Sequence, residues 1–234
     1  MTAFTVERCI KSAMLDAGLI QRGETPSVQD YAEMIDRLND ICITEQTQGL
    51  KLWLNEMQDI VLVAGTYVYP IGPSIGVTPI RPMRVLEAYY SDTNNVSTPL
   101  TMLSWNDWNL LGGRYSSGSI HSFFVDKGLD YMKVHVSATP DTQAATGLLQ
   151  VLVQGPVAQV SAISDRVDFP IEWFLFLRWA LAADIATGQP QAVIDRCEGK
   201  AMQLRQVLTD WDVEDAATLF SPSGQSGFSA SAFR

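Results

Sequence analysis

The chain has 234 residues, of which 47% are hydrophobic, and it carries a formal net charge of −10. This length allows one large domain or two small ones with a packed core, and an acidic balance without runs of Lys or Arg disfavours a protein that wraps around nucleic acid. No stretch approaches the roughly 18 apolar residues of a membrane span, and the first residues lack the basic-then-apolar order of a signal peptide. We therefore expect a protein made in the cytosol, with no membrane partner.

Two helices are predicted at the start of the chain. Apolar residues recur at helical spacing from Phe4 until Gly18 interrupts the run. Further on, Ser27 stands three residues before Asp30 in the order of a capping box, and the next apolar stripe ends near Gly49. Both stripes predict amphipathic helices.

Strands are predicted in the middle of the chain, where the helical period is lost from about residue 58. Residues 59–63 and 66–69, separated by an Ala-Gly turn, are predicted to form a β-hairpin. Further strands are predicted at 85–90, 122–125, 132–136 and 148–153. A short helix at 105–111, capped by Ser104, interrupts them.

The helical pattern returns after the strands, beginning with Pro170 at a first-turn position. The run that follows is apolar on nearly all sides, so this helix is expected to be central. Pro190 opens a last helix, whose apolar stripe ends at Trp211. Helices at both ends with strands between them predict an α+β fold: an α-helical bundle with an inserted β-rich module and an extended C-terminal tail.

The last part of the chain is predicted to act as a docking arm. The helical bundle, the β-rich insertion and the arm are assigned to residues 1–57 with 166–211, to 58–165 and to 212–234. The arm is first acidic and then small and polar, so it buries too little apolar surface to form a core. Its spaced aromatic anchors, Phe220, Phe228 and Phe233, are candidate residues for filling grooves on a partner. The alternative is an arm that packs back on its own domain.

No residue pattern in the sequence points to catalysis, a metal or a cofactor. His121 and His135, the two histidines, lie in or beside predicted strands and lack the spacing of zinc ligands. Cys9, Cys42 and Cys197 are far apart and odd in number, so buried thiols are predicted rather than a disulfide or a zinc site. The glycine-rich loops lack the spacing of phosphate-binding motifs and are predicted to be turns.

Two further sets of residues leave an alternative open. The first is an acidic cluster, Asp210, Asp212, Glu214 and Asp215. It is interpreted as a solvated charge run, with a catalytic carboxylate pair somewhere in the chain as the alternative. The second set is aromatic: Trp105, Trp108, Tyr89, Tyr90 and Tyr115. Core or cross-strand packing is the favoured interpretation, and a sugar- or base-stacking face is the alternative.

Four segments occur in an order that resembles a known family. They are Gly-Glu-Thr-Pro-Ser at 23–27 before a helix with Arg37-Leu-Asn-Asp40, Leu-Val-Ala-Gly-Thr-Tyr-Val-Tyr-Pro-Ile-Gly at 62–72, Arg-Pro-Met-Arg-Val-Leu-Glu-Ala-Tyr-Tyr at 81–90, and Asp-Phe-Pro-Ile-Glu at 168–172. Their order over most of residues 5–210 resembles the head-to-tail adaptor, or tail accessory factor, family of short-tailed bacteriophages (podoviruses). The loop at 112–118 does not match the family pattern.

The resemblance implies a structural ring subunit rather than an enzyme. Family members form a ring, typically of twelve copies, that extends the DNA channel beneath the portal. The implied partners are the portal protein, identical copies and other tail components such as the hub, tail needle or tailspike, while DNA passes without tight binding. The implied location is the virion tail, after assembly in the host cytoplasm. A virion-associated peptidoglycan-cleaving enzyme and a carbohydrate-binding module are the alternatives.

Overall fold

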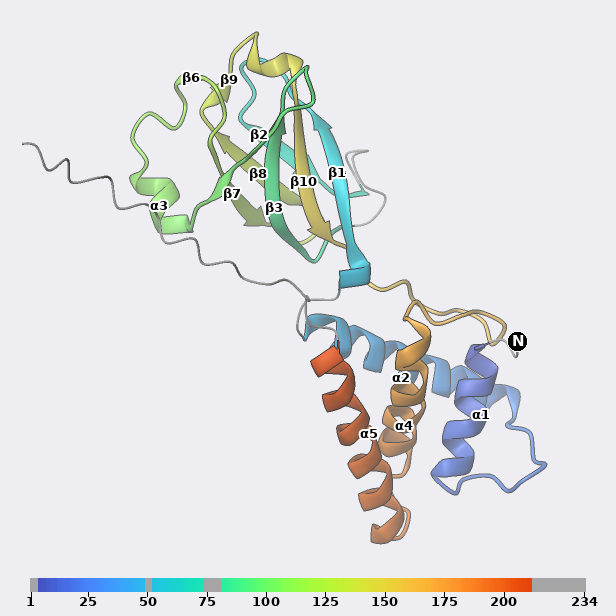
Figure 1. Ribbon diagram of the computed structural model, residues 1–234. Helices are drawn as coiled ribbons and strands as arrows, with labels where there is room; N and C mark the ends of the chain where they lie inside the picture. Colours follow the sequence, from blue (N-terminus) through green and yellow to red (C-terminus); the bar gives the residue numbers. More distant parts are fainter. Residues whose placement is uncertain (1–3, 49–51, 74–80, 212–234) are drawn as a thin grey trace, which may run out of the picture.

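The structure is a computed structural model that describes residues 4–48, 52–73 and 81–211. Helices α1, α2, α4 and α5 gather at one end of the molecule and the strands and α3 at the other, and we call these ends the helical part and the strand part (Figure 1). The predicted mixed α+β class is confirmed. None of the described helices is long and apolar enough to span a bilayer.

The first two helices, α1 (Val6–Asp16) and α2 (Val28–Thr47), both begin at side-chain caps. The predicted capping box is confirmed: the Ser27 hydroxyl accepts from the Asp30 backbone N–H at 3.1 Å, and the Asp30 carboxylate accepts from the Ser27 backbone N–H at 2.8 Å. These bonds satisfy backbone groups that have no partner within the helix. Gly18, at φ 75°, follows the end of α1 and permits a turn that other residues rarely adopt.

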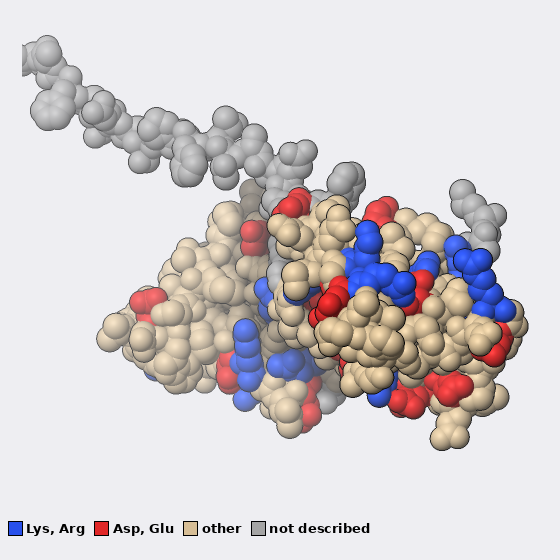
Figure 2. All heavy atoms as spheres, turned by 90° about the horizontal axis from the view of Figure 1, so that it is seen from below, with Lys and Arg blue, Asp and Glu red and all other residues tan. Residues whose placement is uncertain are grey.

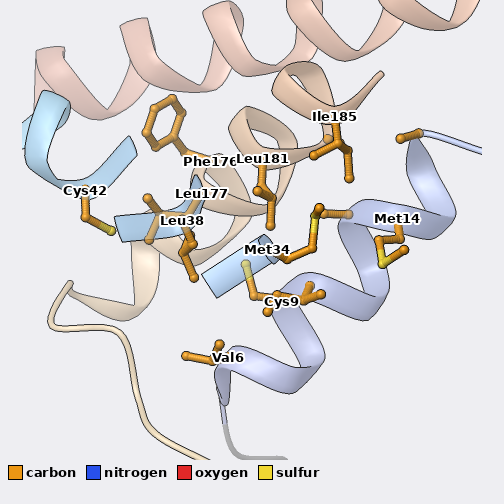
Figure 3. Packing of buried hydrophobic residues seen from close by; sticks show 14 of the residues in the cluster. Val6, Cys9, Met14, Met34, Leu38, Cys42, Phe176, Leu177, Leu181 and Ile185 are labelled. Carbon is orange, nitrogen blue, oxygen red and sulfur yellow. The ribbon is translucent and has the colours of Figure 1, made fainter. Parts of the chain in front are cut away.

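Helix α4 (Phe174–Ile185) is central in the helical part, as its apolar sequence predicted. It packs against α1, α2 and α5 (Gln191–Trp211). Figure 3 shows Leu177 of α4 beside Leu38 of α2, and both are almost completely buried. The buried residues of these helices form one apolar cluster, which is separate from the apolar cluster of the strand part.

The strand part contains two four-stranded sheets. The first has the order β1 (Asn55–Val61), β10 (Leu148–Gln154), β3 (Arg84–Ser91), β4 (Ser97–Pro99), and the second β2 (Val68–Ile71), β8 (Met132–Ser137), β7 (Ser122–Lys127), β5 (Thr101–Met102). Smaller elements are α3 (Trp105–Leu110) and a parallel pair, β6 (Ser117–Gly118) with β9 (Thr139–Pro140). Residues of both sheets share one apolar cluster, including the fully buried Phe123 and Leu149. The strand part is therefore held together by sheet-on-sheet packing.

The predicted hairpin between 59–63 and 66–69 is wrong. The turn itself exists, since Thr66 N–H donates to the Val63 carbonyl at 3.0 Å and Gly65 has a φ of 81°. However, β1 pairs with β10 and β2 pairs with β8, so the chain passes from one sheet to the other at this turn. The seven-residue β10 pairs with β1 along its whole length, which the four-residue β2 cannot do.

The return segment, residues 155–165, packs with the helices although the sequence assigned it to the insertion. Val157 and Val160 belong to the helical cluster. The Asn39 side chain of α2 both donates to and accepts from the Val160 backbone, at 2.9 Å each, and Gln46 accepts from the Val157 N–H at 2.8 Å. Two amide side chains of α2 thus fix the path by which the chain re-enters the helical part.

Candidate interaction surfaces

The predicted docking residues Phe220, Phe228 and Phe233 lie outside the described residues, as does the whole predicted arm at 212–234. Any surface that the structure itself offers must therefore lie on the helical part, the strand part or the segments between them.

The two histidines have different surroundings. His135 on β8 lies against the rings of Trp108 and Phe124, with centroid distances of 5.9 and 5.7 Å, and burial lowers its pKa. His121 is exposed beside β7 and places Nδ1 3.4 Å from the Ser119 carbonyl oxygen. Within residues 4–48, 52–73 and 81–211, no three His, Cys, Asp or Glu side chains are grouped to hold a metal ion.

All three cysteines are free and buried, as the sequence predicted. Burial raises the pKa of the Cys9 and Cys42 thiols to about 12. Both thiols therefore stay protonated at neutral pH, where only a thiolate would be nucleophilic. Their role is apolar packing, and Figure 3 shows both of them within the helical core.

The two tryptophans of α3 pack on the second sheet but differ in exposure. Trp108 is only 4% exposed and stacks on Phe124 at 5.9 Å, which confirms core packing for this residue. Trp105 contacts the same phenylalanine at 5.3 Å yet is 61% exposed. One aromatic side chain of this helix is therefore available to a ligand or partner.

The predicted tyrosine members of the aromatic set lie in separate places. Tyr115 packs against Tyr67 with ring centroids 4.7 Å apart and is 52% exposed. On β3, the Tyr89 hydroxyl donates to the Glu87 carboxylate, while Tyr90 packs against the strand cluster. The five predicted residues do not make one continuous ring-contact face.

The carboxyl groups with a shifted pKa do not suit a general acid. Among the described residues these are Asp30, Asp92 and Asp165, and hydrogen bonds lower the pKa of each, from the Ser27 side chain for Asp30 and from backbone amides for the other two. A carboxylic acid that donates a proton near neutral pH needs a raised pKa instead. Of the predicted acidic cluster, Asp210 lies exposed on α5 and the other members lie outside the described residues.

One candidate surface is a groove of about 810 Å³ over α4, with α2 and α5 as its walls. Its floor contains Phe176, Ala180 and Ala183 of α4. The two alanines have small side chains and are partly buried. Ile41 of α2 and Met202 of α5 add apolar surface along the walls.

Two sets of ion pairs bracket this groove. At the middle of α2, Arg37 pairs with Asp184 of α4 at 2.8 Å and with Glu33 at 3.0 Å, and these hydrogen bonds raise the pKa of the guanidinium. Toward the C-terminal end of α2, Arg205 of α5 pairs with Glu45 at 3.1 Å. The two α2 residues are eight positions apart, which is about 12 Å along a helix axis. The groove between them has the length of about two helical turns.

Negative charge dominates the groove. Its lining includes two guanidinium groups and six carboxylates: Arg37, Arg205, Glu33, Asp36, Asp40, Glu45, Asp184 and Glu198. Asp36, Asp40 and Glu198 make no ion pair with the rest of the described chain. The groove therefore combines an apolar floor with uncompensated carboxylates, which suits a partner that carries apolar and cationic side chains together.

This groove was not predicted from the sequence. The sequence predicts a central α4, but the groove depends on how far apart α2 and α5 lie on that helix. The available signal was a helix apolar around its circumference with the small residues Ala180 and Ala183 on one side. Comparison of the chain with protein-family models and with curated proteins finds no match.

Proposed function

We propose that this chain is a structural ring subunit that joins a phage portal to its tail and extends the DNA channel. In this proposal a helical bundle at 1–57 and 166–211 forms the ring, and a β-rich insertion at 58–165 faces outward or toward other tail components. An arm at 212–234 docks on the portal. The partners are the portal protein, identical copies and tail components such as the hub, tail needle or tailspike.

The observation that carries this proposal is the uncovered side of α4. A helix that is apolar all round is stable in water when all of its sides are covered. Helices α1, α2 and α5 pack against α4, while Ala180 and Ala183 line the open groove. Such a helix suits a subunit whose apolar packing is completed by a neighbouring molecule.

The charge distribution supports a channel that DNA passes without tight binding. The chain has a net charge of −10, and Figure 2 shows basic and acidic side chains interleaved on the face seen from below, with no broad basic surface there. Tight binding to duplex DNA depends on clustered Lys and Arg that displace counterions. We expect weak binding by the assembled ring at physiological salt. Tight binding that weakens steeply with added salt would contradict this expectation.

The direct test is electron microscopy of the purified protein mixed with portal. We expect rings on the portal, and only weak self-association of the isolated protein at micromolar concentration, because an arm that becomes ordered on binding offsets its entropy loss only in the complex. Sedimentation of the protein alone measures the second point. Absence of any complex with portal would overturn the proposed function.

Truncation tests the proposed arm. Removing residues 221–234 should leave the thermal unfolding transition nearly unchanged and weaken portal binding by at least about tenfold, or roughly 1.4 kcal/mol. Each buried phenylalanine contributes about 1.5–3 kcal/mol, so Phe228→Ala with Phe233→Ala should reproduce much of the loss, and Phe220→Ala should add to it. A matched Ser229→Ala, Ser231→Ala variant should bind normally. Unchanged affinity of the truncated protein, or a markedly lower unfolding temperature, would assign the segment to the protein's own core.

A carbohydrate-binding module is the second candidate, favoured by the exposed rings of Trp105 and Tyr115 on the strand part. Exposed aromatic faces stack on sugar rings. Glycan binding without turnover that is lost in Trp105→Ala would favour this candidate, whereas release of peptidoglycan fragments by the purified protein would favour an enzyme.

A further inference from the structure

The groove and α1 lie on opposite sides of α4. On one side, Phe174 contacts Phe4 with ring centroids 4.9 Å apart, and Arg178 pairs with Asp16 of α1 at 2.5 Å. The groove floor is formed by Phe176, Ala180 and Ala183. Because successive residues of a helix are rotated by about 100°, these floor positions point away from positions 174 and 178. A molecule in the groove would thus cover the side of α4 that its own α1 does not.

The outer face of α1 carries cations around an exposed leucine. Val6, Ile10 and Ala13 form the buried stripe of this helix. Arg8, Lys11 and Leu15 lie on the other side and are exposed, Leu15 by 38%, and Glu7, one turn before Lys11, is the exposed carboxylate of the same face. Arg8 also lies over the rings of Phe4 and Phe174, at 5.2 and 5.7 Å, and neither cation pairs with a carboxylate of the described chain. Apolar and cationic side chains together are the combination that suits the apolar floor and the unpaired carboxylates of the groove.

We propose that the outer stripe of α1 in one copy, defined by Arg8, Lys11 and Leu15, docks in the α2–α4–α5 groove of the next copy. Leu15 lies against the apolar floor, and the two cations face the uncompensated carboxylates of the groove wall, Asp36 and Asp40 of α2. This inference rests on the proposed ring function and names the surfaces that form the ring.

Opposite placement of the two surfaces makes the contact head-to-tail. Because the two patches lie on opposite sides of α4, two copies cannot engage both patches of each other at once, so the contact continues from copy to copy, as a ring when the rotation closes. Each copy offers one groove and one stripe, so every α4 in a closed ring gains its fourth neighbour. Charge complementarity also fixes the direction, since the acidic groove repels a second acidic groove.

A charge exchange tests the contact in the full-length protein. Lys11→Glu alone and Asp40→Lys alone should each weaken assembly on portal by at least about tenfold, because each places like charges together. The double variant restores opposite charges between neighbouring copies and should recover most of the assembly. Lys200→Glu, which makes the same charge change on exposed α5 outside the groove lining, is the matched control and should assemble normally. Thermal unfolding of each variant separates assembly defects from folding defects.

The outcomes separate this inference from the proposed function. If the unaltered protein forms rings on portal and both single variants also do so, the docking surface is wrong while the ring function stands. A double variant that stays as defective as the single ones would likewise overturn the contact. A third outcome is that Asp40→Lys weakens assembly but Lys11→Glu does not. If a peptide of residues 212–234 then inhibits assembly of the unaltered protein, the groove holds the C-terminal segment instead of α1. If the unaltered protein forms no ring, the proposed function itself fails.

Discussion

The helical part and the strand part complete their cores in different ways. In the strand part, two sheets face each other and bury Phe123 and Leu149 fully, and strongly exposed apolar residues such as Leu110 and Leu129 lie at the end of α3 or in a turn. In the helical part, three helices pack against one apolar helix, and part of that helix lines an open, charged groove. Two sheets that face each other cover each other's apolar faces, whereas three helices packed around a central helix leave space for a further helix. Assembly is therefore expected to depend on the helical part.

The largest expected effect tests whether the strand core is independent. Phe123→Ala removes a fully buried ring and should lower the free energy of unfolding by about 3–5 kcal/mol. Hydrogen exchange should speed up in the amides of β7 and β8 and change little in α4, because the apolar clusters are separate. Equal loss of protection in α4 would show that both parts unfold as one unit.

The converse substitution lies in the helical core. Leu181→Ala should cost about 2–5 kcal/mol of unfolding free energy, with faster exchange in the helices and little change in the strands. Leu175→Ala on the same helix is the matched control, because Leu175 is 44% exposed and should cost much less. Denaturant unfolding of both variants measures the difference, and equal costs would contradict the assigned packing of α4.

A smaller effect is expected at the capping box of α2. Ser27→Ala removes the hydroxyl that accepts from the Asp30 N–H and should cost about 1 kcal/mol. Ser27→Thr keeps an acceptor and should cost less. The test is thermal unfolding combined with exchange in the first turn of α2. A Thr variant as unstable as the Ala variant would mean that the hydroxyl is not the stabilising group.

The smallest effect is a pH dependence confined to the strand part. Burial lowers the folded-state pKa of His135 below its usual 6.5, so the unfolded chain takes up a proton first as pH falls. The contribution of the neutral His135 ring to the free energy of unfolding is present above pH 6.5 and is lost as the pH falls toward the folded-state pKa. Between pH 7 and about pH 5, the measured free energy of unfolding should fall more steeply for the unaltered protein than for His135→Phe. A slope for His135→Phe that matches the slope of the unaltered protein would contradict this.

Local chemistry explains what the sequence could predict. The capping box of Ser27 and Asp30 and the cap of α3 by Ser104 depend on residues three positions apart, and both are present. Likewise, an apolar helix such as α4 has to be central wherever its neighbours lie. Burial of the three cysteines follows from their places within apolar helical stripes.

Long-range pairing explains what the sequence could not predict. The turn at Gly65 is local, but the partner of β1 is a strand almost a hundred residues away, and only the sheet shows that pairing. Likewise, Asn39 looks like an ordinary polar residue of α2 until residues 155–165 return to hydrogen-bond with it. Strands of two or three residues, such as β5 and β6, are too short for an alternating pattern. The groove depends on the spacing of three helices, which no single segment encodes.

The two ends of the strand part meet where the helical part begins. Gly155 N–H donates to the Leu54 carbonyl at 2.8 Å, and β1 and β10 run antiparallel directly beyond this bond. The chain therefore leaves the helical part and returns to it at nearly the same place. A short turn from Leu54 to Gly155 could replace the strands without moving the helical segments on either side. We therefore expect that a change in the length of the chain between these two residues leaves the arrangement of the helices unaltered.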